Sequence, residues 1–198
     1  MTGDEIIAKF EEYVDDGTEL SSQEELDLAN KIYNKVCNYR PWNFLKAKAS
    51  GSISGSSITL PTDFSYLVNN YEETGPKTIY LGSTLNPYKI VNWSDRRQYS
   101  NQSVAYIDPT DDTIKFTFTP TETTYEFDYI KIQTAITTAT GPAFPSRFHD
   151  IIYHGMAVDD YAIQQFDKAR SYAPENQAKY DSLLKDMSFW DAQFYINN

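Results

Sequence analysis

The sequence predicts an α+β protein in which both chain ends form a four-helix bundle and the middle forms a small antiparallel β-sandwich or barrel. Residues 1–46 and 147–198 carry apolar side chains at helical spacing. Residues 47–146 are rich in Thr, Ser, Tyr and Pro and contain short alternating runs. The 198 residues suit one domain with an insertion. We therefore expect a helical domain from residues 1–46 and 147–198, and a β-rich insertion from residues 47–146.

Two helices are expected before the insertion. In the first, one face carries the apolar residues Ile6, Ile7, Phe10, Tyr13 and Val14, and residues 15–17 end it. The second begins at "SSQEEL", which offers two overlapping capping boxes, Ser21 with Glu24 and Ser22 with Glu25. It stops before Pro41, because a residue that precedes proline avoids the α region. Cys37 lies on its apolar face, where a packing role is favoured over a nucleophilic one.

The insertion contains seven short strand candidates between turn signals. The tight turn "DPTDD" at 108–112 separates two of them. In "TIKFTF", Ile114, Phe116 and Phe118 face one way. Near Tyr129 the alternation switches, which indicates a bulge or a strand covered on both sides. The candidates are residues 57–61, 65–71, 78–82, 88–93, 103–108, 113–118 and 125–133.

Two further helices are expected at the C-terminal end. The first starts with Ser146 as its N-cap and carries an apolar stripe from Phe148 to Phe166. The chain then breaks at "SYAPEN", and Pro174 lies in the first turn of the last helix.

The two histidines, His149 and His154, are the only ones in the chain. On one helix they lie about 140° apart, so they cannot bind the same metal ion, and zinc-binding helical histidines are spaced i, i+4 instead. Asp150 and His154 have that spacing, but such a pair is typical of a surface contact. We therefore expect no catalytic site, metal or cofactor. A hydrolase using Asp150, His154 or Asp159 is the catalytic alternative.

Asp159 falls in the centre of the predicted apolar stripe, one turn beyond Gly155. A buried carboxylate needs a partner. A hydrogen bond to a loop backbone, or an ion pair with an arginine such as Arg40 or Arg147, is favoured over a contact with another subunit. Gly155 indicates close approach of another backbone, since glycine costs a helix about 1 kcal/mol relative to alanine. Both residues are interface candidates.

The charge balance argues against nucleic-acid binding through a basic surface. There are 17 lysines and arginines against 28 acidic residues, a net charge of −11. The one tight basic pair, Arg96 and Arg97 in "SDRRQ", suits a solvated turn or an interface contact. Sixteen tyrosines fit either wet interfaces or strands, and Tyr106 and Tyr129 are further interface candidates.

Targeting and redox signals are absent from the sequence. No apolar run approaches the length of a membrane-spanning helix. The acidic, amphipathic start "MTGDEIIAKFEEYVDDG" does not resemble a signal peptide. A single cysteine excludes an intrachain disulfide and favours a reducing compartment.

Several ordered stretches resemble the head–tail adaptor, or connector ring, proteins of tailed bacteriophages. They are "LANKIYNKVCNYRPWNFLKA", "ITLPTDF", "YIDPTDDTIKFTFTP", "YEFDYIKI" and "PSRFHDIIYHGMAVDDYAIQQF", which together cover most of the chain. Each is short, and it is their order that makes the resemblance specific.

The resemblance implies a structural virion protein at the head–tail junction, made in the host cytoplasm. It implies a homo-oligomeric ring, commonly of twelve copies, that joins the portal protein to a downstream tail or nozzle protein. DNA would pass through the channel without specific binding, and neither a cofactor nor a membrane is implied. The tyrosine-rich strands leave an alternative open, a carbohydrate- or receptor-binding tail module.

Overall fold

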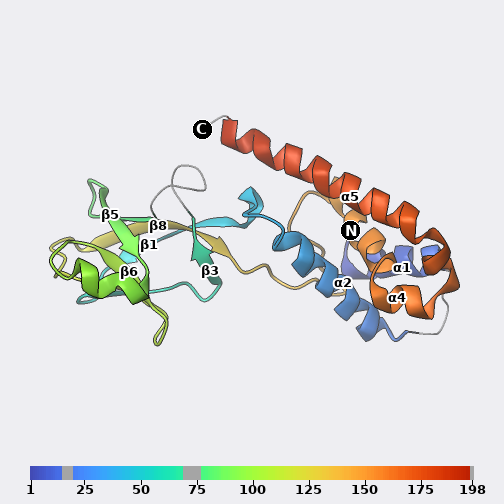
Figure 1. Ribbon diagram of the computed structural model, residues 1–198, viewed down its shortest axis with the longest axis horizontal. Coiled ribbons are helices and arrows are strands. Elements are labelled where there is room, and N and C mark those ends of the chain that lie inside the picture. The colour runs from blue at the N-terminus through green and yellow to red at the C-terminus, as the bar shows by residue number, and fades with distance from the viewer. Residues whose placement is uncertain (15–19, 69–76, 197–198) are drawn as a thin grey trace. The chain divides into compact units, whose positions relative to one another are not determined.

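The computed structural model describes residues 1–14, 20–68 and 77–196, with side chains up to residue 193. Helices and strands form two compact units (Figure 1). The helical unit comprises Met1–Phe44 and Gln133–Asn198, and the β unit comprises Leu45–Ile132. The predicted α+β class is confirmed.

The first two helices follow the sequence prediction. α1 (Gly3–Val14) buries Ile6, Ile7, Phe10 and Val14, while the end predicted at residues 15–17 lies outside the described residues. α2 (Ser22–Cys37) starts at the Ser21–Glu24 capping box and ends before Pro41. Cys37 is buried, and burial raises the pKa of its thiol to about 12. It is therefore a neutral packing side chain.

The C-terminal helices differ from the prediction in two places. A 3-10 turn, η3 (Ser146–Phe148), precedes α3 (Asp150–Ala157), and the helix predicted from Ser146 to Phe166 is broken before α4 (Asp160–Gln165). The break predicted at Pro174 is absent, since α5 runs without interruption from Asp167 to Ile196. The expected four-helix bundle is therefore not confirmed, because the described helical unit holds five α-helices.

Packing explains one correction and helix capping explains the other. Pro174 removes one helical hydrogen bond, but Ala169 and Asn176 on either side of it are fully buried, so packing holds the helix together across it. At the other site, the Asp159 side chain accepts a hydrogen bond from a backbone N–H at the start of α4. In a helix interior that N–H would already be bonded, so aspartate favours a helix start. Periodicity alone does not register either effect.

α3 is the central helix of its unit and contacts α1, α2 and α5. Gly155 lies where these neighbours come closest. A Cβ built on it would overlap Cγ2 of Ile32 on α2 and lie 3.0 Å from Cε2 of Tyr180 on α5. The close approach predicted from Gly155 is thus found, although side chains of the same chain make it rather than another backbone.

The segment after the β unit packs with the helices. The Asn30 side chain donates from Nδ2 to the Ile136 carbonyl at 2.9 Å and accepts from the Ile136 N–H at 2.8 Å. The Phe144 ring meets that of Tyr33 with centroids 5.8 Å apart. Residues 133–146, assigned to the insertion by sequence texture, therefore belong to the helical unit by contact.

The β unit is one eight-stranded, nearly closed, barrel-like sheet with the order β1-β8-β4-β5-β6-β7-β2, and β3 also pairs with β8. A bridge between Ser54 and Ser57 lies between the two outermost strands of this order. The strands are β1 (Lys46–Ser52), β2 (Ser57–Thr59), β3 (Phe64–Leu67), β4 (Thr78–Leu81), β5 (Asn86–Val91), β6 (Ala105–Asp108), β7 (Thr113–Phe116) and β8 (Thr124–Lys131).

Every predicted strand region contains a strand, while β1 was missed; residues 69–71 of the run 65–71 lie outside the described residues. The alternation in β7 holds, since Ile114 and Phe116 are buried and Phe118 packs against the same core. The turn predicted at 108–112 joins β6 to β7.

β8 is the strand on which the β unit is organised. It pairs with β1 along one side, and with β4 and β3 along successive parts of the other. The register of β3 shifts between Phe64 and Tyr66, opposite the end of β8. The neighbouring residues Tyr129 and Ile130 are both buried, which confirms the prediction of a strand covered on both sides.

One strand pair corrects the expectation of a purely antiparallel sheet. β5 and β6 are parallel, with Ile90 opposite Ala105. Parallel neighbours need a crossover connection, because a tight turn reverses the chain direction. The connection here contains a 3-10 helix, η2 (Trp93–Tyr99), which the sheet topology holds on the outside of the β unit.

Replacing Gly155 with alanine is expected to destabilise the chain by about 1–3 kcal/mol, because the added methyl overpacks the α2–α3–α5 contact. This outweighs the helix-propensity gain of about 1 kcal/mol. Urea unfolding followed by circular dichroism measures the change. In the double variant with Ile32→Ala, the cost of Gly155→Ala should shrink. A Gly155→Ala protein as stable as the wild type would contradict the close contact.

Candidate interaction surfaces

Asp159 begins a helix instead of lying within one. Its backbone is extended, and its Oδ1 accepts from the Tyr161 N–H at 3.3 Å as the N-cap of α4. Ser146, by contrast, caps nothing with its side chain, so the N-cap predicted there is wrong. The chain therefore turns at residues 158–159.

The carboxylate of Asp159 is 3% exposed and binds two lysines of α2. Lys31 Nζ lies 2.9 Å from Oδ1, and Lys35 Nζ lies 3.2 Å from Oδ2. Burial by itself would raise the pKa of Asp159, but the hydrogen bonds from the lysines outweigh it and hold the pKa below its ordinary value. The predicted arginine partner is therefore wrong. Arg40 instead lies 3.9 Å from Asp191, and Arg147 lies over Phe148 and Trp190.

The two histidines are buried and have separate partners. His149 Nε2 lies 2.8 Å from the Phe144 carbonyl oxygen, and His154 Nδ1 lies 2.9 Å from Asn176 Oδ1 on α5. Asp150 pairs with Lys9 at 2.9 Å rather than with His154. Within the described residues, no group of three or more His, Cys, Asp or Glu side chains is placed to hold a metal ion. The arrangement of the histidines is that of packed, hydrogen-bonded side chains.

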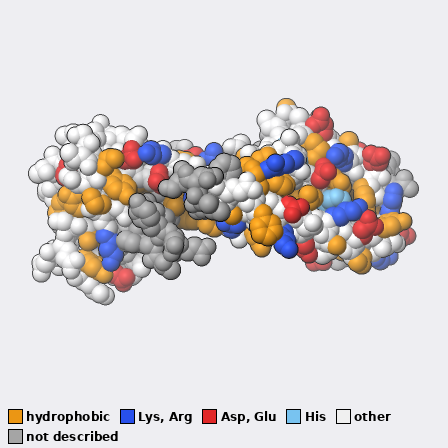
Figure 2. All heavy atoms as spheres, turned by 90° about the horizontal axis from the view of Figure 1, so that it is seen from above, with side chains coloured by type: hydrophobic (Ala, Val, Ile, Leu, Met, Phe, Trp, Pro, Cys, Tyr) orange, Lys and Arg blue, Asp and Glu red, His pale blue; other side chains and the backbone are white. Residues whose placement is uncertain are grey.

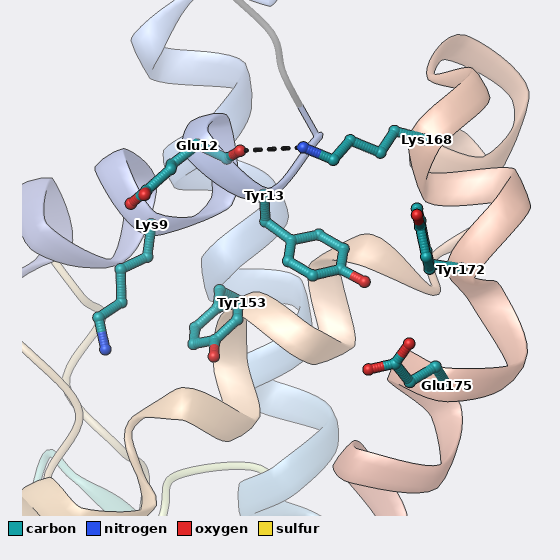
Figure 3. Close-up of a pocket in the computed structure, with 7 residues that line it drawn as sticks. All are labelled: Lys9, Glu12, Tyr13, Tyr153, Lys168, Tyr172 and Glu175. Atoms are coloured by element: carbon teal, nitrogen blue, oxygen red, sulfur yellow. Dashed lines mark hydrogen bonds between the residues drawn. The ribbon is translucent and has the colours of Figure 1, made fainter.

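Three tyrosines from three helices surround a pocket of about 420 Å³ in the helical unit. Tyr13 comes from α1, Tyr153 from α3 and Tyr172 from α5 (Figure 3). The centroid of the Tyr13 ring lies 6.4 Å from that of Tyr153 and 6.4 Å from that of Tyr172. Lys9, Glu12, Lys168 and Glu175 complete the lining.

The second surface lies on the crossover η2 of the β unit. The guanidinium carbon of Arg96 lies 3.7 Å from the Trp93 ring centroid and 6.0 Å from that of Tyr106. Trp93 is 40% exposed, and Arg97, four residues further along η2, is also exposed. We call Trp93, Arg96, Arg97 and Tyr106 the η2 surface.

The interface candidates from the sequence fall into two groups. Arg96 lies 6.0 Å from the Tyr106 ring centroid, and Arg97 follows Arg96 on η2. Asp159 and Gly155 are buried among helices of their own chain, and the Tyr129 hydroxyl donates to Asp63 at 2.8 Å inside the β unit. For these three, a role between subunits stays a prediction. Because their side chains contact their own unit, such a role would be indirect, through the positions of the neighbouring helices or strands.

Sequence patterns do not identify the pocket tyrosines or Trp93 as site residues. Tyr13 was assigned to the buried face of its helix, and in the structure it is half-buried at the edge of that face. An available signal was that Tyr13, Tyr153 and Tyr172 each flank the apolar stripe of an amphipathic helix, where an amphipathic ring meets both core and water. That signal does not reveal which tyrosines meet.

Replacing Asp159 with asparagine is expected to destabilise the chain by about 2 kcal/mol, because two charge-assisted hydrogen bonds are lost at a buried position. Asp150→Asn is the matched control, since Asp150 also binds a lysine but is 42% exposed. Its cost should be about 0.5 kcal/mol or less. Chemical unfolding of both proteins compares them, and equal costs would contradict the assigned role of burial.

Stability should also fall on mild acidification. Burial lowers the pKa of His154, and a nearby Lys179 lowers it further; burial likewise lowers the pKa of His149. The unfolded chain then binds protons more readily than the folded one, so this contribution is complete above about pH 6.5 and is lost as the pH falls through the folded-state pKa values.

Thermal unfolding at pH 7.5 and pH 5.5 measures this loss. Protonation of surface carboxylates affects all variants alike, so the informative quantity is the difference between the wild type and the His149→Gln/His154→Gln double variant. The double variant should lose less stability between the two pH values. Identical pH dependence in the two proteins would show that the buried imidazoles do not contribute.

Comparison with known protein families indicates which kind of protein carries these surfaces. No curated protein sequence matches the chain significantly. The described part of the chain has no helix that is both long and apolar enough to cross a bilayer. The family model described as SU10 adaptor protein matches residues 1–195. This match confirms the resemblance to phage head–tail adaptors and supports a structural role in the virion at the head–tail junction, in contact with other head and tail proteins. The chain belongs to the SU10 adaptor protein family.

Proposed function

We propose that the chain forms a homo-oligomeric ring that joins the portal protein to a downstream tail or nozzle protein and lines the channel for DNA. The observation that carries this proposal is the η2 surface. An arginine held between a tryptophan and a tyrosine, on an exposed crossover, has the composition of the anchors that dominate protein–protein interfaces. The family assignment supplies the setting, and a ring of twelve copies is the expected stoichiometry.

The internal chemistry of the chain supports a role exercised through interfaces. The two histidines and Asp159 are committed to contacts that hold helices together. The family is one of structural adaptors rather than of enzymes. The side chains of the hydrolase alternative, Asp150, His154 and Asp159, bind three different partners.

The charge of the chain suits a channel through which DNA passes without being held. The helical unit has nine basic and eighteen acidic side chains, and the β unit has eight and ten. In Figure 2, acidic and basic groups are interspersed over the helical unit. A wall with excess negative charge repels phosphate groups, so it does not slow a moving duplex by binding it.

Mass measurement over a concentration series, alone and with the portal protein, tests the proposal. We expect assemblies much larger than the monomer, and electron micrographs of them should show closed rings. Trp93→Ala and Arg96→Ala should weaken assembly or partner binding by about tenfold or more, as expected for interface anchors. A protein that stays monomeric under all these conditions would refute the ring.

A further inference from the structure

The tyrosine-lined pocket has the features of a receptor for a cationic side chain. Its rings are tilted by 44° between Tyr13 and Tyr153, and by 73° between Tyr13 and Tyr172, so they form several sides of a box. Aromatic faces attract cations, and one face of Tyr153 already has the Lys9 ammonium 5.5 Å from its centroid. Among the described residues, no cation lies over Tyr13 or Tyr172.

The charged groups of the lining favour an incoming cation over an anion. Figure 3 shows the Glu175 carboxylate extending into the space between the tyrosine rings. Both lysines of the lining already have partners. Lys9 binds Asp150 at 2.9 Å, and Lys168 donates to the Glu12 carbonyl oxygen at 3.5 Å. Glu175 itself is bound by Lys179, in an exposed pair of the kind that contributes little and can exchange.

A guanidinium suits this pocket better than an ammonium. It can stack on a tyrosine face and donate two parallel hydrogen bonds to a carboxylate at the same time. The pocket volume of about 420 Å³ exceeds what one arginine side chain needs, so entry requires no rearrangement of the helices.

The chain carries one arginine that is suited to this role. Four of its five arginines have partners within the chain: Arg40 with Asp191, Arg96 with Trp93, Arg147 with Phe148 and Trp190, and Arg170 with Asp167. The guanidinium of Arg97 is exposed and has no such partner among the described residues. It lies on η2, the 3-10 helix that begins at the exposed Trp93.

We propose that the pocket between α1, α3 and α5 of one copy binds Arg97 from the η2 surface of a second copy. The proposal rests on the self-assembly proposed above and assigns one contact within it. The acidic helical unit attracts the basic η2 surface, which gives the contact its charge complementarity. Because pocket and arginine are different surfaces of the same chain, the contact passes from copy to copy, as a closed ring requires.

A charge exchange in the full-length chain tests the contact. Sedimentation velocity over a concentration series gives the midpoint of assembly for each variant. Arg97→Glu and Glu175→Arg should each shift the midpoint to about tenfold higher concentration or more, and the double variant should recover most of the loss. Tyr172→Ala should weaken assembly as well, since it removes one wall of the cage. Circular dichroism verifies that each variant is folded.

Lys77→Glu is the matched control, because it makes the same change of charge at another exposed position of the β unit. It should leave the midpoint within about twofold of the wild type. Arg97→Lys and Glu175→Gln are milder changes that keep the side-chain size, and each should give an intermediate shift.

The possible outcomes distinguish a failure of this contact from a failure of the proposed ring. A wild type that assembles while the Arg97 and Glu175 variants assemble equally well would overturn the contact and leave the ring standing. Sensitivity to Tyr172→Ala but not to Arg97→Glu would assign the pocket to another segment and also overturn it. If the double variant shows the sum of the two single shifts and no recovery of assembly, the contact is overturned as well. A wild type that never assembles would refute the ring and the contact together.

Discussion

The close approach of α3 to α2 and α5 at Gly155 is the constraint on which the helical unit depends. Only a residue without a side chain fits between Ile32 and Tyr180. This contact places α3 at the centre of its neighbours, and the other polar contacts follow from it. Asp159 at the end of α3 then reaches the lysines of α2, and His154 reaches Asn176 on α5. The pocket tyrosines meet because α1 and α5 both pack against α3.

Features that depend on neighbouring residues in the sequence were predictable. The Ser21–Glu24 capping box, the end of α2 before Pro41 and the inward face of β7 each follow from spacing within a few residues. β1 was not predictable, because "KAKASGS" has low strand propensity and is a strand only through its pairing with β8. The break at Asp159 and the unbroken helix at Pro174 were likewise decided by partners distant in sequence.

The candidate surfaces divide in the same way. Arg96 and Arg97 were visible as the one tight basic pair, because a pair of neighbours needs no fold to bring it together. Trp93 joins them through a helical turn, and Tyr106 through the parallel pairing of β5 with β6. The pocket was out of reach, since Tyr13 precedes the β unit in the sequence while Tyr153 and Tyr172 follow it. A composition of sixteen tyrosines indicates that some lie at interfaces, and only the fold identifies which ones.

The side chains with the most potential for catalysis are committed to contacts inside the chain, in keeping with its membership of an adaptor family. An active site keeps polar groups exposed to a substrate and shifts their pKa values toward the working pH. Here the groups that could do so are turned inward: burial lowers the pKa values of the two histidines, and hydrogen bonds from two lysines lower the pKa of Asp159. The described surface also carries exposed aromatic rings, among them Trp93 with Arg96 stacked on it. Such groups gain free energy mainly by being covered, as aromatic and arginine side chains are at protein–protein interfaces.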